Sequence, residues 1–141
     1  MTEIVEDIDV LESFHTVASY ELDSFGHVNN AYFLNYLEKA RCDFMRLKGL
    51  NFNDFFKWHR YPVVVRVVLD FKRPALADDQ LLIKGWIAKH TATSFTMKYE
   101  IFNRDNEQSI LTGETFHVFV DDNNRPSRIP EEFRKNFLNL S

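Results

Sequence analysis

The sequence predicts an α+β domain of two layers, in which one long helix packs against an antiparallel sheet of about five strands. Three observations support this prediction: one stretch with helical periodicity, several later stretches with strand-like patterns, and short links between those strands. Short links favour antiparallel hairpins over parallel crossovers. With 141 residues, 45% of them hydrophobic, the chain can bury a core without disulfide bonds or a structural metal.

The N-terminal part is expected to contain a loose acidic lead-in over residues 1–12 and then a first strand. Side chains alternate between apolar and polar over much of residues 14–21, which is the period of two that strands show. Residues 23–30 are rich in turn and cap formers. Asn29 or Asn30 is the expected helix N-cap, because an Asn side chain can accept an orphaned backbone N–H. Residues 13–141 show no internal repeat or linker, so they are predicted to form a single domain.

The long helix is predicted from Ala31 onward. Hydrophobic residues step by four and three there, which places them on one buried helical face: Phe33, Leu37, Ala40, Phe44 and Leu47. Glu38 and Arg41 are expected to form an ion pair on the outer side at spacing i, i+3. Gly49 is expected to end the helix, because a residue at that position often needs a positive φ.

The rest of the chain is predicted to be mostly strands. A short helical turn is expected at residues 51–58 and a short C-terminal helix from Pro130. Between them lie four strand-like stretches, at residues 63–71, 81–88, 95–101 and 110–120. Residues 63–71 and 116–120 are apolar on both faces. One face can cover the helix, so the other is expected to meet something else, such as a second subunit.

Composition excludes several classes of function. The formal charge of −4, with basic residues interspersed among acids, gives no footprint for nucleic acid. Cys42 is the only cysteine, so neither an internal disulfide nor a zinc ribbon is expected, and the histidines lack metal-ligand spacing. No apolar run approaches the length of a membrane span, and residues 1–11 lack the apolar region of a secretory signal. A cytoplasmic location is the default expectation.

Asp23 is the leading candidate for catalysis. It precedes a helix N-terminus, where unpaired backbone N–H groups and the helix dipole favour negative charge and can hold an oxyanion. A carboxylate beside that position could activate water as a general base or attack as a nucleophile. The alternative is that Asp23 is a turn or cap residue, which is the commoner role for an Asp before a helix.

Residues near Asp23 also have a functional and a structural interpretation each. Gly26 allows either a tight turn or the close approach of a substrate. His27 could orient Asp23, bind the substrate or donate a proton, or could serve only in hydrogen bonding at the helix start. The side chain of Asn30 is expected to cap the helix whether or not its backbone takes part in chemistry. Tyr32 could line a substrate channel, or it could belong to the core.

The motifs resemble those of the 4-hydroxybenzoyl-CoA thioesterase family, which are hot-dog-fold acyl-CoA thioesterases. The resemblance rests on DSFGHVNNAY at residues 23–32 and YLEKAR at residues 36–41. It continues in VLDFKRPA at residues 68–75 and in DNNRP at residues 122–126, and it covers the chain from Ser13 to Leu138. Plant-type acyl-carrier-protein thioesterases look similar in the first motif. They place Asn two residues after the Asp, where this chain has Phe25.

The resemblance implies a hot-dog domain, in which the antiparallel sheet wraps around the one long central helix. It also implies a homodimer or homotetramer with active sites at the subunit interface. It assigns the catalytic carboxylate to Asp23 and the oxyanion donor to the backbone N–H near Asn30. His27 joins them as a further candidate catalytic residue, and Gly26, Val28 and Tyr32 are candidate substrate-binding residues. The family often has a second acid where this chain has Glu21, which receives no role.

The expected function is hydrolysis of an acyl-CoA to the free acid and coenzyme A, without a metal or redox cofactor. An acyl-carrier-protein thioester is an alternative substrate. Hydration of an enoyl thioester on the same fold is disfavoured by the spacing of Asp23 and His27. A non-catalytic homo-oligomer that binds acyl thioesters is the alternative outside the enzymes. The sequence leaves the length and the aromatic or aliphatic nature of the acyl group open.

Overall fold

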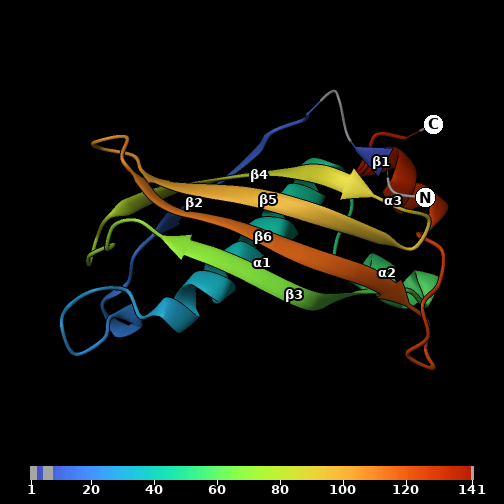
Figure 1. Ribbon diagram of the computed structural model, residues 1–141, viewed down its shortest axis with the longest axis horizontal. Helices are drawn as coiled ribbons and strands as arrows, with labels where there is room; N and C mark the ends of the chain where they lie inside the picture. The colour runs from blue at the N-terminus through green and yellow to red at the C-terminus, as the bar shows by residue number, and fades with distance from the viewer. Residues whose placement is uncertain (1–2, 5–7, 141) are drawn as a thin grey trace.

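The structure is a computed structural model that describes residues 3–4 and 8–140. A single antiparallel sheet forms one layer, and the long helix α1 (Asn30–Leu47) lies across one of its faces (Figure 1). The strands are β1 (Glu3–Ile4), β2 (Leu11–Thr16), β3 (Tyr61–Phe71), β4 (Gln80–His90), β5 (Ser94–Asn103) and β6 (Ser109–Val120). The α+β hot-dog architecture predicted from the sequence is confirmed, with the two-residue β1 as an addition.

The order of the strands follows from short hairpins. Strands β4, β5 and β6 are consecutive neighbours, and β3 pairs with the far side of β6, so the order is β1-β4-β5-β6-β3. Strand β2 pairs with β4 as well. Strand β3 therefore forms one edge of the sheet. Its C-terminal end points toward the side of the molecule where α1 begins (Figure 1).

The first strand differs from its prediction. Strand β2 begins at Leu11, inside the predicted lead-in, and ends at Thr16 instead of Glu21. Beyond it, Val17 exchanges backbone hydrogen bonds with the turn at Asp78 and Asp79, and Ser19–Glu21 form a 3-10 turn. The alternation past Thr16 is therefore not that of a strand, because these backbone groups bond to a loop. The rest of the lead-in includes residues outside the described ranges.

Helix α1 begins where the sequence places it. Asn29 is the N-cap, and its side-chain Oδ1 accepts from the N–H of Ala31 at 3.0 Å. The predicted core face is buried at Phe33, Leu37, Ala40 and Phe44.

Leu47 departs from this prediction, because its side chain is 62% exposed and Met45 is buried instead. Two residues apart on a helix point about 160° away from each other, so only one of them can face the core in the last turn. The predicted pair of Glu38 and Arg41 is also absent: Arg41 donates from Nη1 to the hydroxyl of Tyr99 at 3.2 Å.

Two short helices close the end of the sheet that lies away from the start of α1. Helix α2 (Asn53–Trp58) and helix α3 (Glu131–Asn136) confirm the predicted turns. Each contributes a buried Phe to one aromatic cluster, in which the rings lie 5.0 to 6.2 Å apart: Phe55, Phe95, Phe119 and Phe133. Aromatic contacts of this kind bury large areas and fix the positions of both helices.

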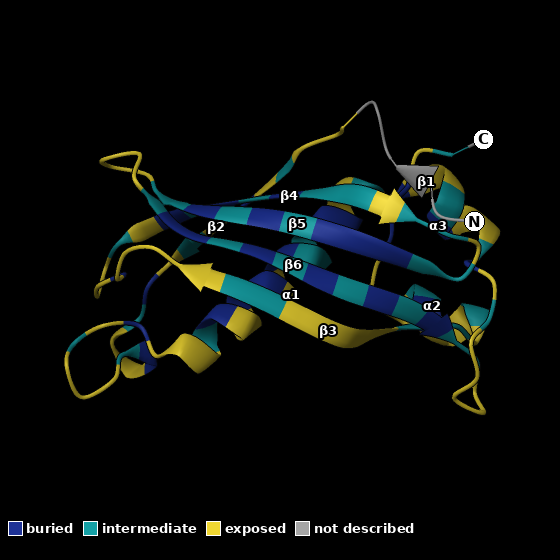
Figure 2. Ribbon diagram, viewed as in Figure 1, coloured by how far each residue is buried: buried dark blue, intermediate teal, exposed yellow. Residues whose placement is uncertain are grey.

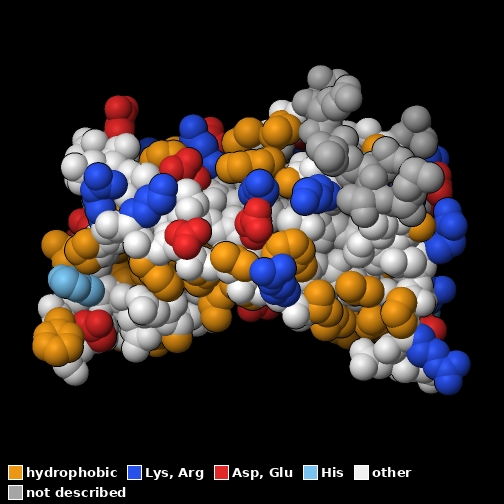
Figure 3. All heavy atoms as spheres, viewed as in Figure 1, with side chains coloured by type: hydrophobic (Ala, Val, Ile, Leu, Met, Phe, Trp, Pro, Cys, Tyr) orange, Lys and Arg blue, Asp and Glu red, His pale blue; other side chains and the backbone are white. Residues whose placement is uncertain are grey.

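The two strands predicted to be apolar on both faces differ in the structure. Along β6, buried and half-buried residues alternate, with His117 and Phe119 buried. Along β3, the run from Val63 to Val67 is exposed (Figure 2). Hydrophobic side chains also gather along the lower edge of the face shown in Figure 3, where β3 runs. The uncovered apolar surface therefore lies on the edge strand.

Candidate active site

A cleft of about 280 Å³ lies at the start of α1. One wall comes from the loop that precedes the helix and from the first turn of the helix, and contains Asp23, His27, Val28 and Asn30. The other wall is the end of β3 and the turn after it: Phe71, Lys72, Arg73 and Pro74. The structure thus brings four of the six predicted site residues into one cleft. Gly26 and Tyr32 do not line it.

Asp23 has one carboxylate oxygen tied to its own loop. Its Oδ1 accepts from the backbone N–H groups of Phe25 at 2.8 Å and of His27 at 3.2 Å. The backbone closes the same loop, because the N–H of Asp23 donates to the carbonyl of His27 at 2.7 Å. Its Oδ2 accepts no hydrogen bond from the described residues, and the side chain is exposed. Asp23 is therefore a turn former with a second oxygen available to the cleft.

The first turn of α1 leaves one donor open. The side-chain Oδ1 of Asn29 accepts from the N–H of Ala31, and the carbonyl of Asn29 accepts from the N–H of Tyr32. The backbone N–H of Asn30 donates to no acceptor within the described part of the chain. The partial positive charge of a helix N-terminus adds to such a donor. This N–H is the group that could hold a developing oxyanion in the cleft.

The remaining predicted residues shape the loop. Gly26 has φ +81°, a conformation that other residues adopt at a cost, so its role as a turn glycine is explained by backbone geometry. Val28 is buried, and its N–H donates to the carbonyl of Ala75 at 2.9 Å, which joins the loop to the turn after β3. Tyr32 is half-buried and packs against the core. His27 is exposed at the cleft.

Glu21 is a residue of the site region to which the sequence assigned no role. Its side chain is buried, with the residue only 5% exposed, and Oε1 accepts from three groups. These are the N–H of Ala18 at 2.7 Å, the hydroxyl of Tyr36 at 2.9 Å and Nε2 of His15 at 3.0 Å. Its carbonyl accepts from the N–H of Asn29. Glu21 therefore anchors both ends of the loop that carries Asp23.

These contacts also set the ionisation of Glu21. Burial raises the pKa of this carboxyl, but the hydrogen bonds from Ala18, His15 and Tyr36 outweigh burial and hold its pKa below the usual value. The spacing of Ala18 and Glu21 is that of a capping box. The sequence signal is hidden because Ala18 has no side-chain oxygen of the kind the motif normally shows.

We expect Glu21→Gln to lower the free energy of unfolding near neutral pH by about 2 kcal/mol, because it removes the charged acceptor of three hydrogen bonds, one buried and two part-buried. A depressed folded-state pKa stabilises the protein above the unfolded-state pKa, and this stabilisation is lost as pH falls through the folded value. The difference in free energy of unfolding between the wild type and Glu21→Gln should therefore shrink as the pH is lowered. Urea unfolding measured at a series of acidic pH values tests this. Glu132→Gln, on the exposed face of α3, is the matched control. If the loss of unfolding free energy in Glu21→Gln does not change with pH, the expectation is contradicted.

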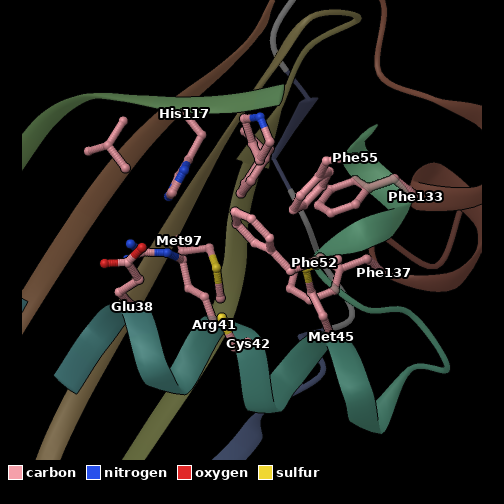
Figure 4. A pocket seen from close by; sticks show the side chains of 13 residues that line it. Glu38, Arg41, Cys42, Met45, Phe52, Phe55, Met97, His117, Phe133 and Phe137 are labelled. Atoms are coloured by element: carbon pink, nitrogen blue, oxygen red, sulfur yellow. The ribbon is translucent and has the colours of Figure 1, made fainter. Parts of the chain in front are cut away.

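A second cavity, of about 130 Å³, lies between the C-terminal half of α1, the sheet, α2 and α3 (Figure 4). Its walls are mostly apolar and include Met45, Met97 and Phe133. Arg41 and Cys42 reach it from α1, while His117 points toward them from the sheet (Figure 4). Cys42 is half-buried. Nothing in the sequence pattern singled out His117.

Comparison with known proteins identifies the family. Residues 17–137 match the thioesterase-like superfamily. The chain belongs to this superfamily. Membership confirms the hot-dog fold and the enzyme class predicted from the sequence, a thioester hydrolase. The closer resemblance to the 4-hydroxybenzoyl-CoA thioesterase family stays a prediction within it.

Individual relatives cover different parts of the chain. The chloroplastic acyl-acyl carrier protein thioesterase ATL3 of Arabidopsis thaliana is 29% identical over 92% of this chain and 70% of that relative. The long-chain acyl-CoA thioesterase FadM of Escherichia coli is 42% identical over 48% of this chain and 50% of that relative. A 1,4-dihydroxy-2-naphthoyl-CoA thioesterase structure from Synechocystis has a TM-score of 0.87 at 21% identity, covering 94% of this chain and 98% of that one. The last likeness shows the fold.

Two further findings concern the described ranges only. None of the helices within residues 3–4 and 8–140 has the length and hydrophobicity that a membrane crossing requires. The same ranges contain no group of three or more His, Cys, Asp or Glu side chains arranged to hold a metal ion.

Proposed function

We propose that the protein hydrolyses an acyl-CoA thioester, with Asp23 as the base or nucleophile and the N–H of Asn30 as oxyanion donor. The single observation that carries this proposal is the cleft that Asp23 and the open helix N-terminus share. A carboxylate oxygen and a free donor on the same wall are the two groups that acyl transfer needs beside a carbonyl. The reaction consumes only water and needs no metal or redox cofactor.

As a general base, Asp23 takes a proton from a water molecule whose oxygen attacks the thioester carbon. The carbonyl oxygen becomes an oxyanion beside the N–H of Asn30 and the dipole of α1. Collapse of this intermediate breaks the carbon–sulfur bond and releases the CoA thiolate. As a nucleophile, Asp23 would attack the same carbon and form an anhydride that water then cleaves.

His27 is expected to contribute less to the hydrolysis than Asp23. Free thiols have a pKa near 8.5, so the thiolate is a stable leaving group and needs little help from an acid. His27 lies at the cleft, where it can hydrogen-bond the thioester. Lys72 and Arg73 on the opposite wall are cations that could bind the phosphates of CoA. Arg73 also donates to the carbonyl of Ser109 at 2.8 Å.

A homodimer joined through β3 belongs to the same proposal. Among the residues that the structure describes, the strand pairs only with β6, and the run from Val63 to Val67 exposes apolar side chains. An edge strand of this kind invites pairing with a second copy, and antiparallel pairing has two-fold symmetry. The cleft is lined by Phe71 at the end of this strand, so pairing would place it near the partner subunit.

We expect Val65→Lys to weaken self-association at least tenfold. Val65 is 61% exposed at the centre of the exposed run, and in a two-fold interface each lost apolar contact counts twice. Sedimentation of the variant over a range of concentrations measures the change. Leu76→Lys introduces the same charge at an exposed site outside the strand and is the control. Equal sedimentation of both variants and the wild type would contradict the proposed interface.

A thiol-release assay across acyl-CoAs of graded length, with an aromatic one included, tests the central proposal. Release of CoA by the wild type is the expected result. Calorimetry on the same compounds separates the alternative, because tight binding without thiol release would indicate a non-catalytic binding protein.

An acyl carrier protein is the second candidate for the thiol partner. The observation that favours it is the similarity to ATL3, which extends over 92% of this chain. Phe25 in place of the plant-type Asn argues against it. Hydrolysis of one acyl group offered on CoA and on an acyl carrier protein decides between the two.

A further inference from the structure

The candidate catalytic groups are carried by the two arms of one small loop, residues 21–29, which leads into the N-terminus of α1 (Figure 1). At the base of this loop, the N–H of Asn29 donates to the carbonyl of Glu21 at 2.9 Å. Near its tip, the N–H of Asp23 donates to the carbonyl of His27 at 2.7 Å, and a β-bridge joins the arms between these two bonds. One arm therefore carries Asp23, and the other leads directly into Asn30.

The side chain of Glu21 fixes the base of this loop. Its Oε1 accepts from the hydroxyl of Tyr36 at 2.9 Å and from Nε2 of His15 at 3.0 Å. A carboxylate has no hydrogen to give, so both of these partners are donors. Tyr36 belongs to α1 and His15 to β2, whereas the third donor, the N–H of Ala18 at 2.7 Å, lies between β2 and the loop. One oxygen atom thus ties the loop to a helix, to a strand and to the segment that follows the strand.

Tyr36 is a well-packed partner for this carboxylate. The residue is only 2% exposed, and its ring centroid lies 4.2 Å from that of His15 and 5.5 Å from that of Phe33. Phe33 also lines the cleft that contains Asp23. Close packing on both sides leaves the Tyr36 hydroxyl little freedom to move. This hydroxyl is therefore a fixed point on α1 from which Glu21 takes its position.

We propose that Glu21 is a positioning residue for the hydrolysis, which sets the separation between the carboxylate of Asp23 and the N–H of Asn30. Along one arm, Glu21 lies two residues before Asp23. On the other arm, its carbonyl holds the N–H of Asn29, the residue directly before Asn30. Both groups must meet one carbonyl carbon, and a misplacement of about 1 Å can lower a rate by about 10²-fold. The inference rests on the proposed thioester hydrolysis.

The alternative is that Glu21 only stabilises the fold. Its loss would then affect catalysis no more than the loss of a similar hydrogen bond elsewhere, and Ser13 offers this comparison. Ser13 is 2% exposed on β2, and its Oγ donates to Oδ2 of Asp43 on α1 at 2.6 Å. This bond joins the same strand and helix as the bonds of Glu21, but Asp43 lies about 20 Å from Asn30 along α1.

Steady-state thiol release by Glu21→Gln and Ser13→Ala separates these two roles. We expect Glu21→Gln to lower kcat by about 10- to 100-fold, because the loop base loses its charged acceptor and the two groups lose their alignment. KM should change by less than about threefold, since the lost alignment acts on the transition state. Ser13→Ala should keep kcat within about twofold of the wild type, although it also removes a bond between β2 and α1. Circular dichroism checks that both variants are folded at the assay temperature.

Tyr36→Phe is a second variant, which keeps the packed ring and removes only the hydroxyl that donates to Glu21. We expect it to lower kcat by about three- to tenfold with little change in KM. If both residues act through the same bond, the double variant should lose no more in kcat than Glu21→Gln alone. Losses that multiply would show that the two residues act separately, and would overturn the proposed path through Tyr36.

Hydrogen exchange of the Asn29 amide reads the loop base without a substrate. We expect it to be at least about tenfold faster in Glu21→Gln than in Ser13→Ala, because the carbonyl that accepts from this amide is no longer held in place. Equal exchange in the two variants would overturn the proposal. Wild-type kcat in Glu21→Gln, or an equal loss in Ser13→Ala, would overturn the positioning role and leave the hydrolysis standing. Absence of thiol release by the wild type would instead overturn the proposed function, and the positioning role with it.

Discussion

We expect Asp23→Asn to lower kcat/KM for acyl-CoA hydrolysis by about 10²- to 10⁴-fold, the usual contribution of a positioned acid or base. The amide keeps an oxygen that can accept from the N–H groups of Phe25 and His27, so the loop retains its hydrogen bonds. The variant loses only the charge and the basicity of the free oxygen. Steady-state thiol release measures the effect, and urea unfolding checks that stability changes little.

Asp121 provides a close structural control for this test. Its Oδ1 accepts from the N–H groups of Asn123 at 2.9 Å and Arg125 at 3.0 Å, the same pattern that Asp23 shows. Its loop is also closed by backbone bonds of the same kind, and it follows β6, away from the cleft. Asp121→Asn should therefore leave thiol release unchanged. Full activity in Asp23→Asn, or equal losses in both variants, would show that Asp23 is a turn former and no more.

The pair of aspartates explains why the sequence predicts the site only in part. Local spacing is enough to place Asp23, His27 and Asn30 together, because they lie within one loop and the first helical turn. The opposite wall, residues 71–74, comes from a distant segment, and the sequence analysis did not place it at the site. The local pattern of an Asp that caps its own loop occurs twice, so this pattern does not distinguish a catalytic position.

The sequence analysis did not identify the residues whose roles depend on partners far along the chain. Glu21 acquires its role from Tyr36, which α1 brings to it, and from a backbone group of Ala18. His117 is defined by a chain of contacts across two strands and the helix. Neither has a periodicity or spacing that marks it. Both are buried polar groups whose partners are known only once the helix lies on the sheet.

The elements themselves were predicted well where one physical signal dominates. The period of two across β5 and the apolar stripe of α1 are each set by burial on one face. The prediction was wrong where another interaction takes over. The alternation beyond Thr16 continues in the sequence, but the hydrogen bonds of Val17 go to the turn at Asp78 and Asp79. Short-range patterns cannot reveal such a competition, because the competing groups lie far along the chain.

The contact that sets α1 on the sheet lies between Phe44 and Gly85. We expect Phe44→Ala to lower the free energy of unfolding by about 3–5 kcal/mol, the usual cost of removing a buried Phe side chain. The ring of Phe44 is fully buried and sits above the backbone of β4 at Gly85. Removal leaves a cavity that two regular elements cannot easily collapse. Urea unfolding, monitored by circular dichroism, measures the loss.

Gly85→Ala should lower the free energy of unfolding by about 1–3 kcal/mol in the wild type, because its new Cβ would lie within 2.9 Å of Cζ of Phe44. In the Phe44→Ala background the same substitution should cost less than about 1 kcal/mol, since the ring that it overlaps is gone. The two substitutions together are therefore expected to cost less than the sum of their separate costs. Additive losses would show that the two residues do not meet, and that α1 is held over β4 by other contacts. Backbone conformation would not explain the glycine in that case, because the φ of Gly85 lies outside the left-handed region that favours glycine.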